Sequence, residues 1–238
     1  MLEHSIQWMN MAETVLEGLL LCRVLLLRLH RPYTFITLYC LLSVFFDSIS
    51  WCAGWTTDAA QQAGAVQGFF FALLVPLAAW EVFDEIAPRA AKWRRLELGR
   101  LVSGVLLTLV FTLIVFTNVD VRDNHGDSVA LSLAALLCWA GCASASLAFL
   151  WYTRRILRAQ KIEFAPNTSV WTLFFMLSNA VTVVYCLFVL LGPAVSGTVS
   201  SSGIVLLQCA DAAIVIWCIC KLKRTAAVVS AVSAKEEQ

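Results

Sequence analysis

Long apolar segments separated by short polar breaks alternate along the whole chain. A helix needs about 20 mostly apolar residues to cross a hydrocarbon core about 30 Å thick. Seven segments meet this length, at 6–27, 33–55, 64–86, 98–118, 129–152, 169–191 and 200–220. The pattern predicts an all-α fold in which residues 1–224 form a bundle of seven transmembrane helices. A short flexible cytoplasmic tail at 225–238 is expected to follow it.

The basic residues gather in alternate breaks, and this predicts the orientation. Sixteen of the 17 Lys and Arg residues lie on the side of the first, third and fifth breaks and the C-terminal tail. Arg122 alone lies on the opposite side, in the fourth break. The positive-inside rule then places the N-terminus outside and the C-terminus in the cytoplasm, which requires an odd number of spans. A cleaved signal peptide at the start is disfavoured, because Glu13 and Glu17 interrupt its apolar stretch and its first residues are acidic rather than basic.

The amino-acid composition supports a membrane protein and argues against nucleic acid as a binding partner. Of the 238 residues, 60% are hydrophobic and 14% are charged, against about 25% charged in a soluble domain. The 17 basic residues are nearly balanced by 16 acidic ones, so a nucleic-acid-binding surface is not expected. The expected partner is the lipid bilayer, and a protein partner stays open.

The histidines exclude several kinds of membrane enzyme. His4, His30 and His125 all fall in a terminus or a break, so none lies at membrane depth to hold haem or zinc. Zinc hydrolases, Ser/His intramembrane proteases and bis-histidine cytochromes are therefore disfavoured. The last span has no lysine before Lys221 at its end, so it cannot carry retinal in mid-membrane. We expect no enzymatic activity, cofactor or metal site. The nine cysteines all fall within spans and are expected to pack as small apolar groups.

Carboxyl and amide side chains within the spans are the candidates for a functional site, since such groups are costly in lipid. At 1.5 Å per residue, Glu17 and Asp211 both reach the middle of the membrane, and Glu13 and Asp47 lie together nearer the outer surface. If the first span touches the second and seventh, these acids converge and can share a proton. The candidates for binding a ligand or a proton are Glu13, Glu17, Asp47, Asn179, Gln208 and Asp211.

A second interpretation of such polar positions is helix packing. Small and hydroxyl residues let membrane helices approach closely, and the Gly104, Thr108, Thr112 and Gly141, Ala145 spacings are assigned to packing alone. For the carboxyl residues Glu13, Glu17, Asp47 and Asp211, packing with an ion pair is an equal alternative to a functional cavity.

The inner end of the third span carries a second group of acids. Arg23 and Glu81 lie at similar depths, so the sequence predicts a buried ion pair between them. Asp84 and Glu85 are expected to form a solvated cap next to the basic break that follows.

The third span ends in Trp80-Glu81-Val82-Phe83, and an aromatic run at 38–46 precedes Asp47. With these motifs the chain resembles a group of uncharacterised bacterial seven-helix inner-membrane proteins. The resemblance implies a seven-helix bundle in the bacterial inner membrane and brings no established activity.

Three functions remain open for this polar interior. The favoured one is a ligand-binding or sensory membrane module that acts through a partner. It is favoured because Pro76 is the only proline well inside a span, and carriers use more such breaks to build midplane sites. The second is a small-solute or proton-coupled transporter. Seven spans can be divided into three helices, one linker helix and three helices, which is an arrangement typical of carriers. The third is an accessory subunit of a membrane complex.

The predicted orientation can be tested by labelling. In a variant without the native cysteines, a cysteine placed at Asn124 should react with an impermeant thiol reagent added from outside. One placed at Ala159 should not, because the charge bias puts it in the cytoplasm. The reverse pattern would overturn the orientation.

Overall fold

Helices make up almost all of the described chain. The computed structural model describes residues 2–54, 57–85, 91–118, 126–161, 165–191 and 197–224. Within these ranges there is no β-strand, and the elements are α1 (Leu2–Leu26), α2 (Thr34–Ala53), α3 (Asp58–Asp84), α4 (Ala91–Asn118), α5 (Gly126–Ala159), α6 (Pro166–Leu191) and α7 (Gly197–Lys221). The all-α prediction is confirmed. The predicted tail at 225–238 and the position of Asn124 lie outside the described residues.

Six of these helices, α2 to α7, are long and apolar enough to cross a membrane. This is the pattern of a multi-pass membrane protein. The remaining helix, α1, has 25 residues, but Glu13, Glu17 and Arg23 lower its apolar character. A seventh span at α1 and the side of the membrane on which each end lies stay predictions.

Local backbone chemistry ends the helices where the polar breaks begin. Arg28, with a φ of 57°, takes the left-handed conformation that stops α1. Gly54, with a φ of 85°, ends α2 in a region that favours glycine. Thr57 then starts α3, because its hydroxyl accepts a hydrogen bond from the backbone N–H of Ala60 at 3.3 Å.

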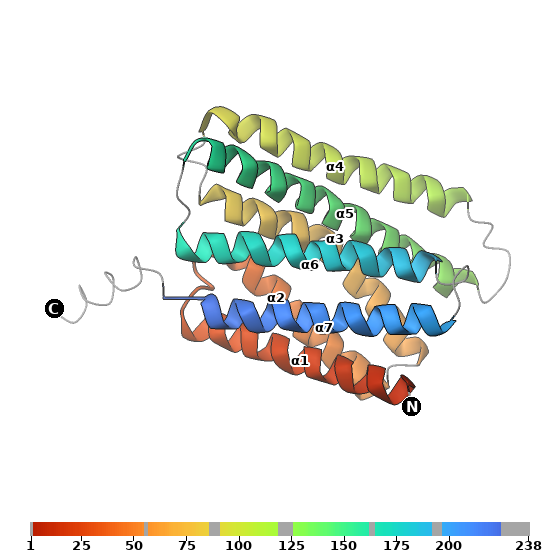
Figure 1. Cartoon of the computed structure of the whole chain (residues 1–238). Helices are drawn as coiled ribbons and strands as arrows, with labels where there is room; N and C mark the ends of the chain where they lie inside the picture. The colour runs from red at the N-terminus through yellow and green to blue at the C-terminus, as the bar shows by residue number, and fades with distance from the viewer. Residues whose placement is uncertain are drawn as a thin grey trace.

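Six helices form a closed ring, and α4 lies outside it. Neighbours around the ring are α1, α2, α3, α5, α6 and α7, and α1 packs against α7 to close it. A few contacts also join α3 to α6 across the ring, while α4 packs mainly on α5 at the edge of the bundle (Figure 1). By chain order, α1–α3 and α5–α7 each contribute three helices to the ring, and we call each set a three-helix unit. The contact between α3 and α5, the most extensive in the bundle, joins the two units. The expected neighbours of the first span, α2 and α7, are confirmed.

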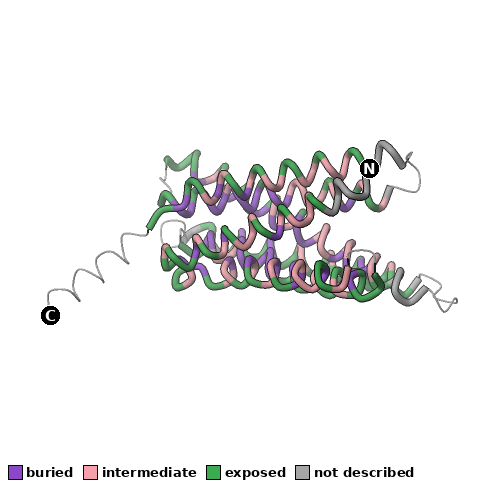
Figure 2. The backbone as a smooth tube through the Cα atoms, turned by 90° about the horizontal axis from the view of Figure 1, so that it is seen from below, coloured by how far each residue is buried: buried purple, intermediate pink, exposed green. Residues whose placement is uncertain are grey.

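The apolar core is concentrated at one end of the ring. We call the end where α1 and α7 finish the inner end, after the predicted orientation, and the opposite end the outer end. Buried positions lie on the facing sides of two layers of helices (Figure 2). The main core lies in the inner half and includes Leu20, Val24, Phe83, Trp171 and Leu222. Among the described side chains of α7, burial begins only at Val215.

Close packing between α4 and α5 depends on the two predicted small-residue motifs. A Cβ placed on Gly104 would lie 2.9 Å from Cβ of Ala145, and one on Gly141 would collide with the Thr108 side chain. The assignment of these motifs to packing is confirmed. They hold α4 against the ring from outside.

A substitution at this contact should loosen α4. Gly141→Ala adds a methyl group where Thr108 already lies, and overpacking of this kind typically costs about 1 to 3 kcal/mol. Thermal unfolding in detergent should show the loss. The control is Gly99→Ala on the same α4, where a Cβ meets no atom within 4 Å. Equal melting temperatures for the two variants would show that α4 does not need this close approach.

Candidate functional site

Carboxyl groups from three helices meet near the middle of the ring. Glu17 of α1 accepts a hydrogen bond from the Ser43 hydroxyl of α2 and interacts directly with Asp47, also of α2. Two carboxyl groups can form a hydrogen bond only if one of them holds a proton. On the other side, Asp211 of α7 accepts a hydrogen bond from Ser178 of α6 at 3.1 Å.

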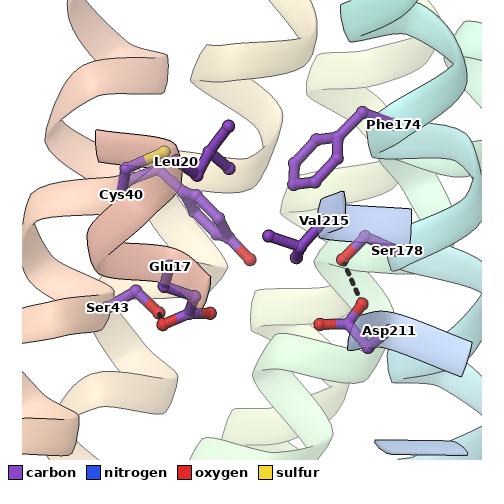
Figure 3. A pocket seen from close by; sticks show the side chains of 9 residues that line it. Glu17, Leu20, Cys40, Ser43, Phe174, Ser178, Asp211 and Val215 are labelled. Carbon is purple, nitrogen blue, oxygen red and sulfur yellow. Dashed lines mark hydrogen bonds between the residues drawn. The ribbon is translucent and has the colours of Figure 1, made fainter. Parts of the chain in front are cut away.

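A small cavity separates these two groups. Figure 3 shows Glu17 and Asp211 on opposite sides of it, each with its serine partner. The lining residues come from α1, α2, α6 and α7, and they are Glu17, Leu20, Tyr39, Cys40, Ser43, Phe174, Ser178, Asp211 and Val215. About 10 Å³ is open to the centre of a water molecule, which is room for about one ordered water.

Polar groups continue from the cavity toward the outer end. Glu13 lies one helical turn from Glu17 on the same face of α1, within electrostatic range of Asp211 and Asp47. Further out, the amide of Gln208 donates to the Asn10 side chain at 2.5 Å and joins α7 to α1. Gln67 of α3 donates to Asp47 at 3.3 Å. We call Glu13, Glu17, Asp47 and Asp211 the carboxyl cluster.

Aromatic side chains lie beside the cavity. The Tyr39 ring is 4.7 Å from that of Phe71 and 5.7 Å from that of Phe175, measured between centroids, and both Tyr39 and Ser178 line the cavity. Phe174 and Phe175 are both buried. The cluster is thus polar toward the outer end and apolar toward the inner end.

Within the described residues, the carboxyl cluster has no basic partner. None of its members forms a hydrogen bond or an ion pair with a Lys, Arg or His side chain there. No group of three or more His, Cys, Asp or Glu residues in the same ranges lies close enough to hold a metal ion. Among the described residues, the donors to the cluster are therefore hydroxyl and amide groups.

The predicted site residues are brought together in part. Glu17 and Asp211 share the cavity, with Asp47 in contact with Glu17, Glu13 one turn away and Gln208 about one turn from Asp211 on the outer side. Asn179 is buried but does not line the cavity, since its neighbour Ser178 faces Asp211 instead. That any of these residues binds a ligand or a proton stays a prediction.

Tyr39 and Ser178, two polar residues that line the cavity, were not identified from the sequence. Tyr39, Ser43 and Asp47 recur every four residues on one face of α2, so this stripe could have indicated Tyr39. Ser178 offers no such signal, because a single serine in a span is an ordinary packing residue.

The predicted ion pair between Arg23 and Glu81 is wrong, since each side chain bonds to a helix end. Glu81 accepts hydrogen bonds from the backbone N–H groups of Phe35 at 3.1 Å and Ile36 at 3.0 Å. Arg23 donates to the carbonyl of Leu222 at 3.2 Å, just past the end of α7. Helix N-termini attract anions and C-termini attract cations, so both charges are stabilised without meeting.

Other polar side chains join helix ends at the same level. One oxygen of Glu85, Oε2, accepts from the Tyr33 hydroxyl at 2.6 Å and from Thr168 at 2.5 Å. The Asn167 amide donates to the carbonyl of Lys223 at 2.6 Å and accepts from its N–H at 3.0 Å. Glu85 is exposed as expected, but it is a helix contact as well as a solvated cap.

Comparison with protein-family models, with curated proteins and with solved structures finds no match to this chain. The resemblance to bacterial seven-helix inner-membrane proteins therefore stays a prediction.

Because Arg23 and Glu81 have separate partners, their replacements should act independently. Arg23→Leu and Glu81→Leu each remove hydrogen bonds from a charged group, worth about 1.5 to 3 kcal/mol, and the losses should add in the double variant. Glu81→Gln is the control, because its carbonyl oxygen can still accept from α2. Unfolding free energies measured in detergent would test this. If the second leucine instead rescued the stability lost with the first, the result would indicate that Arg23 and Glu81 form an ion pair.

Proposed function

We propose that this protein is a non-enzymatic multi-pass membrane protein that binds a proton at its carboxyl cluster and changes its helix packing in response. The observation that carries the proposal is the meeting of Glu17 and Asp211 across a small cavity, each with a serine donor and neither with a basic partner among the described residues. Such an arrangement is a place to hold a proton.

The size of the cavity favours a proton over an organic ligand. Pockets for small molecules typically enclose about 300 to 1,000 Å³, whereas about 10 Å³ is open to the centre of a water molecule here. A proton needs only an acceptor, and one ordered water could link the two carboxyl groups. The favoured ligand of the module is therefore the proton.

The position of the cluster explains how protonation could alter the fold. Glu17 and Asp47 belong to one three-helix unit, and Asp211 belongs to the other. Ionised carboxyls on both sides repel one another across the α1–α7 contact, and protonation removes the repulsion. The two units would then shift relative to each other. A sensory module could pass this shift to a protein partner.

One observation favours the second candidate, a proton-coupled transporter. The ring contains two sets of three helices with α4 outside, and polar contacts lie on the outer side of the cluster, between Gln208 and Asn10 and between Gln67 and Asp47. Carriers place their sites near the midplane between repeated units. The accessory-subunit function has no comparable contact in its favour.

The basic bias of the inner breaks supports a cytoplasmic inner end. Together with the resemblance given above, it favours a bacterial inner membrane as the location.

Proton binding should be visible in infrared difference spectra between pH 5 and pH 9. A protonated carboxyl in the interior gives a high-frequency C=O band, and Asp211→Asn should remove or shift this band while keeping the hydrogen bond from Ser178. The control is Asp58→Asn at the exposed start of α3. If the band is absent, or survives in both Asp211→Asn and Glu17→Gln, the acids are packing residues.

Proton flux separates the sensory function from transport. Purified protein in liposomes should be given an imposed pH gradient, with Asp211→Asn as the matched variant. Flux that disappears in this variant would establish the transporter. A protein that shows the infrared response without flux would be a sensor.

A further inference from the structure

We propose that the polar contacts at the inner end form a gate that closes the carboxyl cluster off from solvent on that side. We call the set of Arg23, Glu81, Glu85, Asn167 and Thr168, with their hydrogen-bond partners, the inner clamp. The inference rests on the proposed function in one respect, which is that the cluster is the site the gate serves. The gate itself is argued from contacts alone.

The inner clamp links five of the six ring helices. Glu81 and Glu85 of α3 bond to the start of α2, at Phe35, Ile36 and Tyr33. Glu85 also joins α3 to Thr168 of α6, and Asn167 joins α6 to the residues that follow α7. Arg23 links α1 to Leu222, the residue that follows α7.

Only two of these links cross from one three-helix unit to the other. They are the Glu85 contact with Thr168 and the Arg23 contact with Leu222. The remaining links hold helices within a unit. Loss of the two crossing links would leave the α1–α7 and α3–α6 contacts at the inner end without these bonds, while α3 and α5 would still hold the units together.

Glu85 is suited to release such a contact. A single oxygen, Oε2, accepts from both Tyr33 and Thr168, so one movement of this side chain breaks both bonds. Glu85 is exposed, and water can therefore compete for its oxygens. A buried carboxylate would lose too much solvation for this role.

Apolar side chains seal the space between the inner clamp and the cavity. Trp171 is fully buried, with its ring centroid 6.0 Å from that of Tyr33 and 5.7 Å from that of Phe174. Cys218 of α7 is also fully buried within this core. Toward the outer end the corresponding contacts are polar, from Gln208 to Asn10 and from Gln67 to Asp47. The structure is thus closed at the inner end.

Two native cysteines can report on the gate. Cys218 is buried behind the inner clamp, and Cys220, two residues along α7, is exposed. Each should be retained alone in a variant whose other eight cysteines are replaced. An impermeant methanethiosulfonate reagent is then added to either side of sealed vesicles. The side from which Cys220 reacts defines the inner side, and Cys218 should react slowly from both.

Opening the inner clamp should expose Cys218 from the inner side only. Glu85→Ala removes the acceptor of both bonds, and we expect the Cys218 labelling rate to rise about tenfold or more from that side. Thr168→Val removes one crossing bond with little change of shape and should give a smaller rise in the same direction. Glu85→Gln keeps an acceptor oxygen and should stay near the parent rate. Ser144→Ala, whose hydroxyl bonds to Ala140 of its own helix, should also stay near it.

Two results would overturn the gate. The first is a Cys218 labelling rate that is unchanged in both Thr168→Val and Glu85→Ala. If Glu85→Ala shows no melting transition and so does not fold, the result for Thr168→Val alone decides. The second is an equal rise from both sides, which indicates general loosening. Labelling does not depend on proton binding. If the variants expose Cys218 but no infrared carboxyl response is seen, the gate stands and the proposed function is rejected. If the infrared response is seen but the variants do not expose Cys218, the proposed function stands and the gate is rejected.

Discussion

Charge that lies out of reach of water needs a partner, and the arrangement of this protein depends on how each charge obtains one. Glu81 and Arg23 bond to helix ends of opposite partial charge. The carboxyl cluster relies on hydroxyl, amide and carboxyl neighbours instead. Helix ends are found only at the ends of a bundle, so side chains in its middle cannot use them. The charges of Glu81 and Arg23 at the inner end are therefore bonded to backbone groups, while those at the centre have only side-chain neighbours.

This division matches the distribution of the core. The inner half combines the inner clamp with a dense apolar core around Trp171 and Phe83, whereas polar contacts dominate toward the outer end. Local stability follows the number of buried apolar contacts. The inner half is thus the more densely packed part of the ring.

Much of the fold could be predicted from the sequence, because each span carries its own apolar pattern. The meeting of Glu17 and Asp211 could be predicted as well, since counting residues along straight helices gives their depth. The face of a helix is harder to assign. Asn179 is one position from Ser178, about 100° around the helix, and this separates a residue that lines the cavity from one that does not.

The contacts of Arg23 and Glu81 could not be predicted in the same way. Their partners are backbone groups at the ends of α7 and α2, and every residue carries such groups. No residue type in the sequence marks them. The position of α4 outside the ring was also not predicted. Small residues such as Gly104 and Gly141 indicate that a helix packs closely, but they do not indicate which helix it packs against.

The partners of Arg23 also set the order in which the bundle can be completed during synthesis. Arg23 lies in the first helix, whereas Leu222 follows the last one. Asn167 likewise obtains its partner only when Lys223 has emerged. Helices are made and inserted from the N-terminus onward. The Arg23 guanidinium can therefore form this hydrogen bond only after nearly the whole described chain has been made. A nascent chain cut short before α7 would leave this charge without its carbonyl.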